Sequence, residues 1–190
     1  FDNENAQVLV AGPVVPSPNF TFNYPVGLSM VAIGAETPEK DLAKLLGIDA
    51  VDLKAARYDP AQGAYRKYAD NPADPFLRHA LGRAFWVSAP AALVRSIAGE
   101  ETTDDPFSIA IVPGWQMIGN PFTTAADIEF ATVTVNGDTV SLRVAAQRGW
   151  VRDYMWAYDA FLRSYTLLSP SIDWASTIIS KGRGVFFRSF

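Results

Sequence analysis

Three short sequence landmarks occur twice in this chain, in the same order, and this recurrence constrains the fold more than any other feature. The offset is 87 residues at the first landmark (114 minus 27) and 100 at the other two (158 minus 58, 182 minus 82), so the second copy holds about 13 additional residues. Ordered recurrence of this kind indicates an internal duplication. The copies are GLSMVA at 27–32 and GWQMIG at 114–119, YD at 58–59 and 158–159, and GRAFW at 82–86 and GRGVF at 182–186.

The duplication predicts a mainly β fold of two tandem β-rich repeats, packed as one sandwich-like or barrel-like unit with pseudo-two-fold symmetry. Hydrophobic residues make up 49% of the 190 residues and charged residues only 19%, a balance typical of β-rich or interface-burying proteins. At this length about 70% of the unfolded surface can be buried, so a core forms without disulfides or metals. We also expect one short helix and an extended N-terminal arm.

Composition and turn signals divide the chain into four segments. We expect an arm at 1–19, a first β-rich repeat at 20–98, a linker at 99–106 and a second repeat at 107–190. The acidic run EETTDDP marks the linker as solvated. The second repeat carries an inserted hairpin, because Asn-Gly at 136–137 stands between alternating β-branched runs.

Local patterns place further elements within these segments. Thr37-Pro38, followed by the run DLAKLLG, predicts a short helix that is capped at Thr37 and ends at Gly47. Other stretches of the sequence favour a turn or two of helix at 89–96 and strands at 107–112, 138–144 and 149–158.

Prolines at positions 13, 16 and 18 exclude helix from the arm and favour polyproline or edge-strand geometry. Two interpretations stay open. The arm is an ordinary first strand of its own subunit, or residues 7–15 add a strand to an open sheet edge of a neighbouring subunit. In the second case the joining residues are Gln7, Val8, Leu9, Val10, Val14 and Val15.

Composition disfavours several classes of protein. Sixteen basic against twenty acidic residues give a net charge of −4 without a basic stripe, so we expect no nucleic-acid partner. No apolar run is long enough to span a membrane. Cysteine is absent, which removes disulfides, thiolate metal sites and cysteine nucleophiles. Because the sequence begins with Phe1 rather than Met, we expect a processed form or a fragment.

Catalytic and cofactor sites find little support in the sequence. His79 is the sole histidine, no Gly-x-Ser-x-Gly elbow accompanies it, and one histidine does not hold a zinc ion. Glycine loops of the phosphate-binding type are missing. We therefore expect no catalytic residue, no cofactor and no metal. A glycosidase-type carboxylate dyad stays open as an alternative, since such dyads carry no local signature.

The recurring Asp and Arg residues favour a structural role. An Asp at the start of a tight turn accepts hydrogen bonds from backbone amides. A buried guanidinium paired with that Asp would tie the turn to the last strand of its repeat. This predicts two pairs, Asp59 with Arg83 and Asp159 with Arg183.

Aromatic residues make up 13% of the chain, and at inward alternating positions they fill a core. Trp150, Tyr154 and Trp156 would share one face of a regular strand, because side chains alternate between faces. If that face is exposed, it forms a platform for a sugar or for a neighbouring subunit.

The second copy also resembles a known module. GWQMIGNP at 114–121, the YD at 158–159 and the Gly-Arg-Gly strand at 182–184 are similar to a β-rich module of bacterial secreted and cell-surface proteins. In that module a Gly-Trp-Asn-Leu-Val/Ile-Gly-Asn-Pro strand precedes a Tyr/Trp-Asp-Pro turn and a closing Gly-x-Gly-Tyr-Trp-Val strand. The first copy departs from the pattern, with Leu28 in place of the tryptophan. The resemblance, over about residues 24–190, implies an exported module for surface architecture, adhesion or glycan contact, without catalysis of its own.

These observations predict a non-enzymatic extracellular structural protein at the cell surface. It would assemble with copies of itself into a filament or layer, joined by strand addition of the N-terminal arm. The alternative is a carbohydrate-binding or adhesive module that uses surface Trp and Tyr, with a glycan as its partner.

Overall fold

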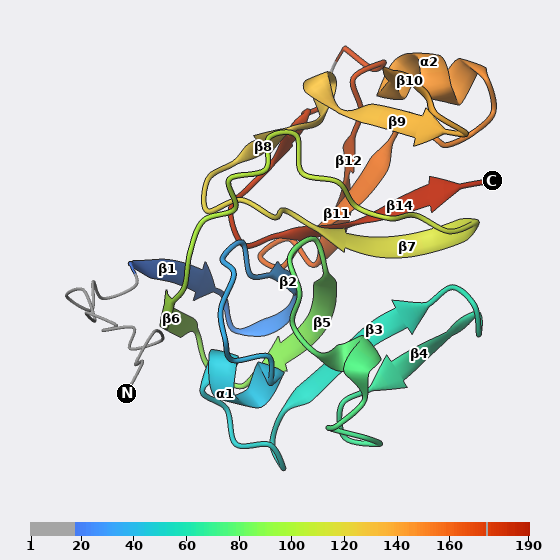
Figure 1. Ribbon diagram of the computed structural model, residues 1–190. Coiled ribbons are helices and arrows are strands. Elements are labelled where there is room, and N and C mark those ends of the chain that lie inside the picture. The colour runs from blue at the N-terminus through green and yellow to red at the C-terminus, as the bar shows by residue number, and fades with distance from the viewer. Residues whose placement is uncertain (1–17, 174) are drawn as a thin grey trace, which may run out of the picture.

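The computed structural model describes residues 18–173 and 175–190, and it confirms that the fold is mainly β (Figure 1). Within these residues the strands form two four-stranded antiparallel sheets and three two-stranded ribbons. The strands of the first half gather in the lower part of Figure 1 and those of the second half in the upper part. The joining segment expected at 7–15 lies outside the described residues.

The first half contributes a sheet in the order β2-β5-β3-β4. Gly27 begins β2 at a φ of 89°, a backbone conformation that favours glycine. The strands are β2 (Gly27–Ala32), β5 (Ala84–Ala89), β3 (Lys54–Asp59) and β4 (Ala64–Lys67).

The second half contributes a sheet in the corresponding order, β7-β14-β11-β12. Gly114 begins β7 at a φ of 105°, as Gly27 begins β2. The strands are β7 (Gly114–Gly119), β14 (Gly184–Ser189), β11 (Met155–Asp159) and β12 (Ser164–Leu168).

The two sheets also share their strand register. Tyr58 lies opposite Tyr65 in the first sheet, and Tyr158 lies opposite Tyr165 in the second. The pairing of β2 with β5 likewise corresponds to that of β7 with β14 under the offsets of 87 and 100 residues. Equal order and register are what a duplication requires, while the duplication itself stays a prediction.

Two reciprocal backbone hydrogen bonds join the halves. The amide of Ala32 donates to the carbonyl of Gly182, and the amide of Gly119 donates to the carbonyl of Gly82, each at 2.9 Å. The four residues correspond in pairs under the same offsets, so each half makes the same contact with the other. Reciprocal bonds of this kind are expected where a two-fold axis relates the two halves.

Three ribbons, two α-helices and two 3-10 turns complete the described structure. The ribbon β1–β6 covers the first half, and the ribbons β9–β10 and β8–β13 belong to the second half (Figure 1). The bounds are β1 (Asn19–Tyr24), β6 (Leu93–Ala98), β8 (Ala126–Asp127), β9 (Thr132–Val135), β10 (Asp138–Ser141), β13 (Ile178–Ile179), α1 (Leu42–Leu46), α2 (Leu142–Gln147), η1 (Pro75–Leu77) and η2 (Ile128–Phe130).

Buried apolar side chains form one cluster in each half and a third cluster between the sheets. The first-half cluster includes Phe22 and Phe85, and the second-half cluster includes Met155 and Phe187. The third cluster holds Met30, Ala84, Trp86 and Met117, with partly buried rings packed against it. The halves therefore share apolar packing and belong to one body.

The expected short helix is confirmed, but its cap was placed wrongly. Helix α1 begins after Asp41, whose carboxylate accepts hydrogen bonds from the amides of Ala43 (2.8 Å) and Lys44. Thr37 is not the cap, because Asp41 stands directly before the apolar run and satisfies the first free amides. Gly47 ends the helix in the left-handed conformation, as expected.

Three other local expectations need correction. Residues 89–96 were expected to be partly helical, yet β6 pairs with β1 there, which satisfies its backbone groups. No strand forms over 107–112. Residues 142–147 form α2 instead of continuing the hairpin strand, because Ser141 accepts a hydrogen bond from the amide of Val144 and starts a helix.

The inserted hairpin itself is confirmed. Strands β9 and β10 pair antiparallel across a two-residue turn. Asn136 and Gly137 both have positive φ, at 52° and 83°, as this type of turn requires.

His79 is buried and structural. Its Nε2–H donates to the carbonyl of Ala35 at 3.0 Å, and burial lowers the pKa of the imidazole to about 4. The unfolded chain takes up a proton near pH 6.5 while the folded chain does not, so stability falls as the pH drops from about 6.5 towards 4.

A His79→Gln variant should remove this pH dependence. Glutamine keeps a donor for Ala35 but does not titrate. Between pH 7 and pH 5 the wild type should lose about 2 kcal/mol more unfolding free energy than the variant. Urea unfolding at the two pH values measures the difference. Equal losses would mean that His79 does not carry this dependence.

Candidate binding cleft

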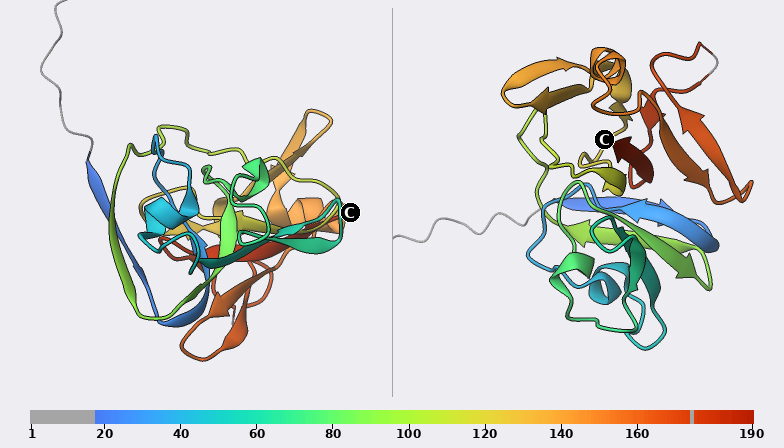
Figure 2. Two further views of the ribbon diagram at one scale, coloured as in Figure 1. Left: turned by 90° about the horizontal axis from the view of Figure 1, so that it is seen from below. Right: turned by 90° about the vertical axis from the view of Figure 1, so that its right-hand side faces the viewer.

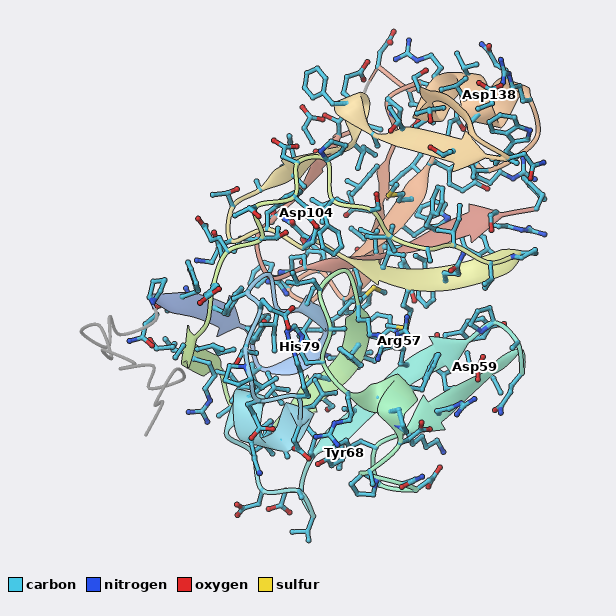
Figure 3. All side chains as sticks on the ribbon, in the orientation of Figure 1. Arg57, Asp59, Tyr68, His79, Asp104 and Asp138 are labelled. Atoms are coloured by element: carbon cyan, nitrogen blue, oxygen red, sulfur yellow. The ribbon has the colours of Figure 1, made fainter. Side chains whose placement is uncertain are left out.

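An apolar cleft of about 460 Å³ opens where the two halves meet. Both sheets contribute to its walls, and every lining side chain is aromatic. Arg57 and Asp59, labelled in Figure 3, flank the cleft residue Tyr58 on β3. The lining residues are Tyr58, Tyr65, Trp115, Trp156, Tyr165 and Phe186.

Strand register sets the positions of these rings. Tyr58 and Tyr65 are directly opposite on β3 and β4, with ring centroids 5.3 Å apart in an edge-to-face arrangement. Trp156 lies opposite Phe186 on β11 and β14. The ring of Trp115, at the start of β7, meets Phe186 edge-on at 6.5 Å. The cleft thus rests on strands, which hold a site more rigidly than loops do.

The pseudo-two-fold arrangement gives two equivalent places beside a pair of tyrosines, and the cleft opens at one of them. Trp86 and Phe186 occupy equivalent positions, opposite Met30 and Met117. Trp86 packs edge-on against Tyr158 at 5.0 Å and fills the space beside that ring.

On the other side, the smaller ring of Phe186 lines the cleft together with the equivalent pair Tyr58 and Tyr65. None of the aromatic contacts among the described residues joins Phe186 to either tyrosine. We attribute the cleft to this difference in ring size.

The tyrosine hydroxyls give the apolar cleft hydrogen-bonding capacity. Tyr65 is 45% and Tyr165 51% exposed, and the hydroxyls of Tyr58, Tyr65 and Tyr165 make no hydrogen bond to another described group. Burial raises the pKa of Tyr165, and the neighbouring hydroxyls of Tyr65 and Tyr158 raise it further. The Tyr165 hydroxyl therefore stays protonated at neutral pH and can donate to a ligand.

The acidic group nearest in sequence to the cleft is already engaged. Asp59 is buried and accepts hydrogen bonds from Arg66 (2.7 Å) and from the amide of Ala61 (2.9 Å). Burial alone would raise the pKa of Asp59, but these hydrogen bonds outweigh it and lower the pKa. Asp59 is therefore a structural anion held by Arg66, without the raised pKa of a general acid.

The predicted Asp–Arg pairs are wrong. Arg83 donates to the carbonyls of Pro75 (2.9 Å) and Arg78 (3.0 Å), while Asp59 pairs with Arg66. Arg66 takes this place because it stands on β4, one strand away from the Asp.

In the second half, Asp159 accepts from the amides of Phe161 and Leu162. It makes no ion pair with Arg183 in the part of the chain that is described. Both Asp residues do cap their turns, as expected.

The expected platform is only partly assembled. Trp150 lies before β11, packs against the second-half core and has the Arg148 guanidinium 4.9 Å from its ring centroid. The spacing argument fails there because the expected strand at 149–158 begins only at Met155, so the residues before it do not alternate as in a regular strand. Tyr154 and Trp156 do lie together, with ring centroids 6.0 Å apart, and Trp156 lines the cleft.

Five of the six cleft residues were not singled out from the sequence as a site. The signal was present, because Tyr58, Trp115 and Phe186 fall within the recurring landmarks. Their meeting depends on contacts between the halves, which the sequence pattern alone does not specify.

A larger, polar hollow of about 730 Å³ lies beside α2. Both arginines that line it already have partners: Arg143 interacts with Glu129 and the Pro170 carbonyl, and Arg152 lies over the ring of Phe190. The aromatic cleft, with several uncovered rings, is the better candidate for binding.

The described residues hold no cluster of three or more His, Asp or Glu side chains suited to a metal ion. None of the described helices is long and apolar enough to cross a membrane. Searches of protein-family models, curated proteins and solved structures find no match to this chain.

Proposed function

We propose that this protein is a non-catalytic structural subunit that assembles with copies of itself, and that a neighbouring copy docks in the aromatic cleft. The cleft carries this proposal. Trp and Tyr side chains in a well-formed apolar pocket are the residues that most often dominate protein interfaces. The low charge of the chain and its resemblance to bacterial surface modules support an extracellular, cell-surface location.

The positions of the first described residue and of the strands that carry the cleft support a head-to-tail contact. The described fold begins at Pro18, whose carbonyl accepts a hydrogen bond from Gly99. This end lies on the left of Figure 1, whereas the β3–β4 hairpin and the start of β7 lie on the right, and Figure 2 agrees. A contact between opposite sides of one molecule need not close, so it gives filaments or layers.

The tip of the β11–β12 hairpin adds an apolar surface. Phe161 is 90% exposed and Leu162 65% exposed, whereas the equivalent turn of the first half carries Ala61 and Gln62. Large apolar side chains exposed together are typical of interaction surfaces. The tip follows β11, which carries the cleft residue Trp156, so a docked copy can cover both.

A Phe186→Trp variant tests the proposal. The larger ring reproduces Trp86 and should fill the cleft, so we expect self-association to weaken about tenfold or more. Sedimentation velocity over a range of concentrations measures it.

Phe130→Trp, at a site 82% exposed, is the matched control and should assemble like the wild type. Circular dichroism verifies that both variants fold. A wild type that stays monomeric at all concentrations would overturn the proposal, as would unaltered assembly of Phe186→Trp.

Glycan binding is a second candidate, favoured by the tyrosine hydroxyls beside the Trp rings. Such rings stack on sugar faces while the hydroxyls bond to sugar oxygens. Retention on a polysaccharide column that Trp115→Ala and Trp156→Ala both abolish, with the fold intact, would support it. Retention that survives both substitutions would place any glycan elsewhere.

A further inference from the structure

The segment that leads into β1 has the sequence pattern of a polyproline ligand. Residues 12–18 are GPVVPSP, in which Pro13 and Pro16 are three residues apart. A polyproline II helix has three residues per turn, so these two prolines would share one face. Segments with prolines at this spacing bind to aromatic-lined grooves because their conformation costs little entropy to fix.

The aromatic cleft offers what such a ligand requires. Its walls include the Tyr58–Tyr65 pair, Trp115 and Phe186, which present ring faces and edges to a proline ring. A polyproline II backbone makes no internal hydrogen bonds, so its carbonyls need donors from the partner. Tyrosine hydroxyls and indole N–H groups are such donors, and the cleft is lined by both residue types.

The ligand segment cannot reach the cleft of its own copy. Pro13 is six residues before Asn19, which spans about 19 Å in polyproline II geometry. A compact chain of this length has a radius of gyration of about 16 Å and hence a diameter of about 40 Å. The start of β1 lies on the left of Figure 1, and the β3–β4 hairpin and the start of β7, which carry cleft residues, lie on the right. The segment can therefore reach only the cleft of another copy.

We propose that the aromatic cleft binds residues 12–18 of a neighbouring copy in polyproline II conformation. This inference rests on the proposed self-assembly and says which segment and which cleft join the copies. It differs from strand addition by residues 7–15, because groove binding requires the prolines, whereas strand addition requires the alternating apolar residues and a free sheet edge.

Two arm variants of the full chain separate these joints. Pro13→Ala/Pro16→Ala should weaken self-association at least about tenfold, while Val8→Ser/Val10→Ser should leave it unchanged. Sedimentation velocity measures both. The opposite pattern would overturn the inference in favour of strand addition, while the proposed self-assembly would stand.

A mixing experiment then tests the direction of the contact. The proline variant has an intact cleft, and Phe186→Trp has an intact arm. At concentrations where each variant alone is monomeric but the wild type assembles, an equimolar mixture should form heterodimers and nothing larger, because only one joint per pair remains. A mixture that stays monomeric would overturn the inference.

If the wild type does not self-associate, the proposed function fails, and a peptide tests the groove on its own. A synthetic peptide of residues 10–19, titrated into the full-length protein, should change its tryptophan fluorescence. The change should be lost in Phe186→Trp and with a peptide that carries alanine at positions 13 and 16. The same response to both peptides, or none to either, would overturn the inference.

Discussion

Gly184→Ala should destabilise the fold by about 3 kcal/mol, because there is no room for a methyl group where the two sheets meet. A Cβ at position 184 would stand 2.2 Å from the Cβ of Ala84 and 3.0 Å from Cγ of Met30. Both neighbours belong to the cluster between the sheets, and Ala84 is fixed to its strand, so the backbone must shift. Urea unfolding followed by tryptophan fluorescence measures the loss.

The exchange variant Ala84→Gly/Gly184→Ala gives the matched test. Positions 84 and 184 are equivalent in the two halves, and the interface accommodates one methyl group for the pair. The double variant should therefore recover most of the stability lost in Gly184→Ala, apart from about 1 kcal/mol for the glycine introduced into β5. A double variant as unstable as the single one would contradict the pseudo-two-fold packing.

Asn120→Asp should also cost about 3 kcal/mol at neutral pH. Asn120 is buried just after β7, and its amide nitrogen donates to the carbonyls of Thr124 (2.8 Å) and Ile179 (3.0 Å). A carboxylate would face these carbonyl oxygens without a proton to share. Thermal or urea unfolding of the variant beside the wild type measures the loss.

The pH dependence of the stability lost in Asn120→Asp shows whether the charge of the new side chain or its shape causes the loss. Protonation of the new carboxyl restores a donor, so the deficit of Asn120→Asp should shrink as the pH is lowered from 7 towards 4. Asn23→Asp, at an exposed position on β1, is the control and should change stability by less than about 0.5 kcal/mol. A deficit that is the same at both pH values would mean that electrostatic repulsion is not its cause.

Local signals in the sequence predicted local structure well. Asn136-Gly137 fixed the inserted hairpin, Gly47 the end of α1, and the two recurring Asp residues their turns. In each case the deciding interaction lies within a few residues, so it is visible in a short stretch of sequence.

Contacts between distant residues were not predictable in this way. Strand β6 forms because β1 pairs with it across about 70 residues of chain, and its own sequence was compatible with a helical turn. Arg66 rather than Arg83 binds Asp59 because pairing of β3 with β4 places it alongside. The cleft has Phe186 from one half and the Tyr58–Tyr65 pair from the other among its lining residues, and only the packing of the halves brings them to one site.

Trp86 and Phe186, at equivalent positions of the two halves, differ in size, and this difference suggests how two similar halves can form a cleft on one side. Trp86 fills the space beside Tyr158, while Phe186 leaves the equivalent space open. If the packing were fully symmetric, the spaces beside the two tyrosine pairs would be either both filled or both open. One smaller ring therefore opens the cleft at one of the two equivalent places, and a contact between that cleft and the arm of another copy is head-to-tail and need not close.

Disulfide trapping between copies tests the proposed joint most directly. Because the chain contains no cysteine of its own, only the introduced thiols can form disulfides. Val15→Cys would place a thiol in the arm, and Ala64→Cys would place one beside the cleft residue Tyr65. When the two single variants are mixed and oxidised, the account predicts disulfide-linked heterodimers, and far fewer when Val51→Cys, on an exposed loop, replaces Ala64→Cys. Equal cross-linking to positions 51 and 64, or none to position 64, would contradict the docking of one copy's arm in the next copy's cleft.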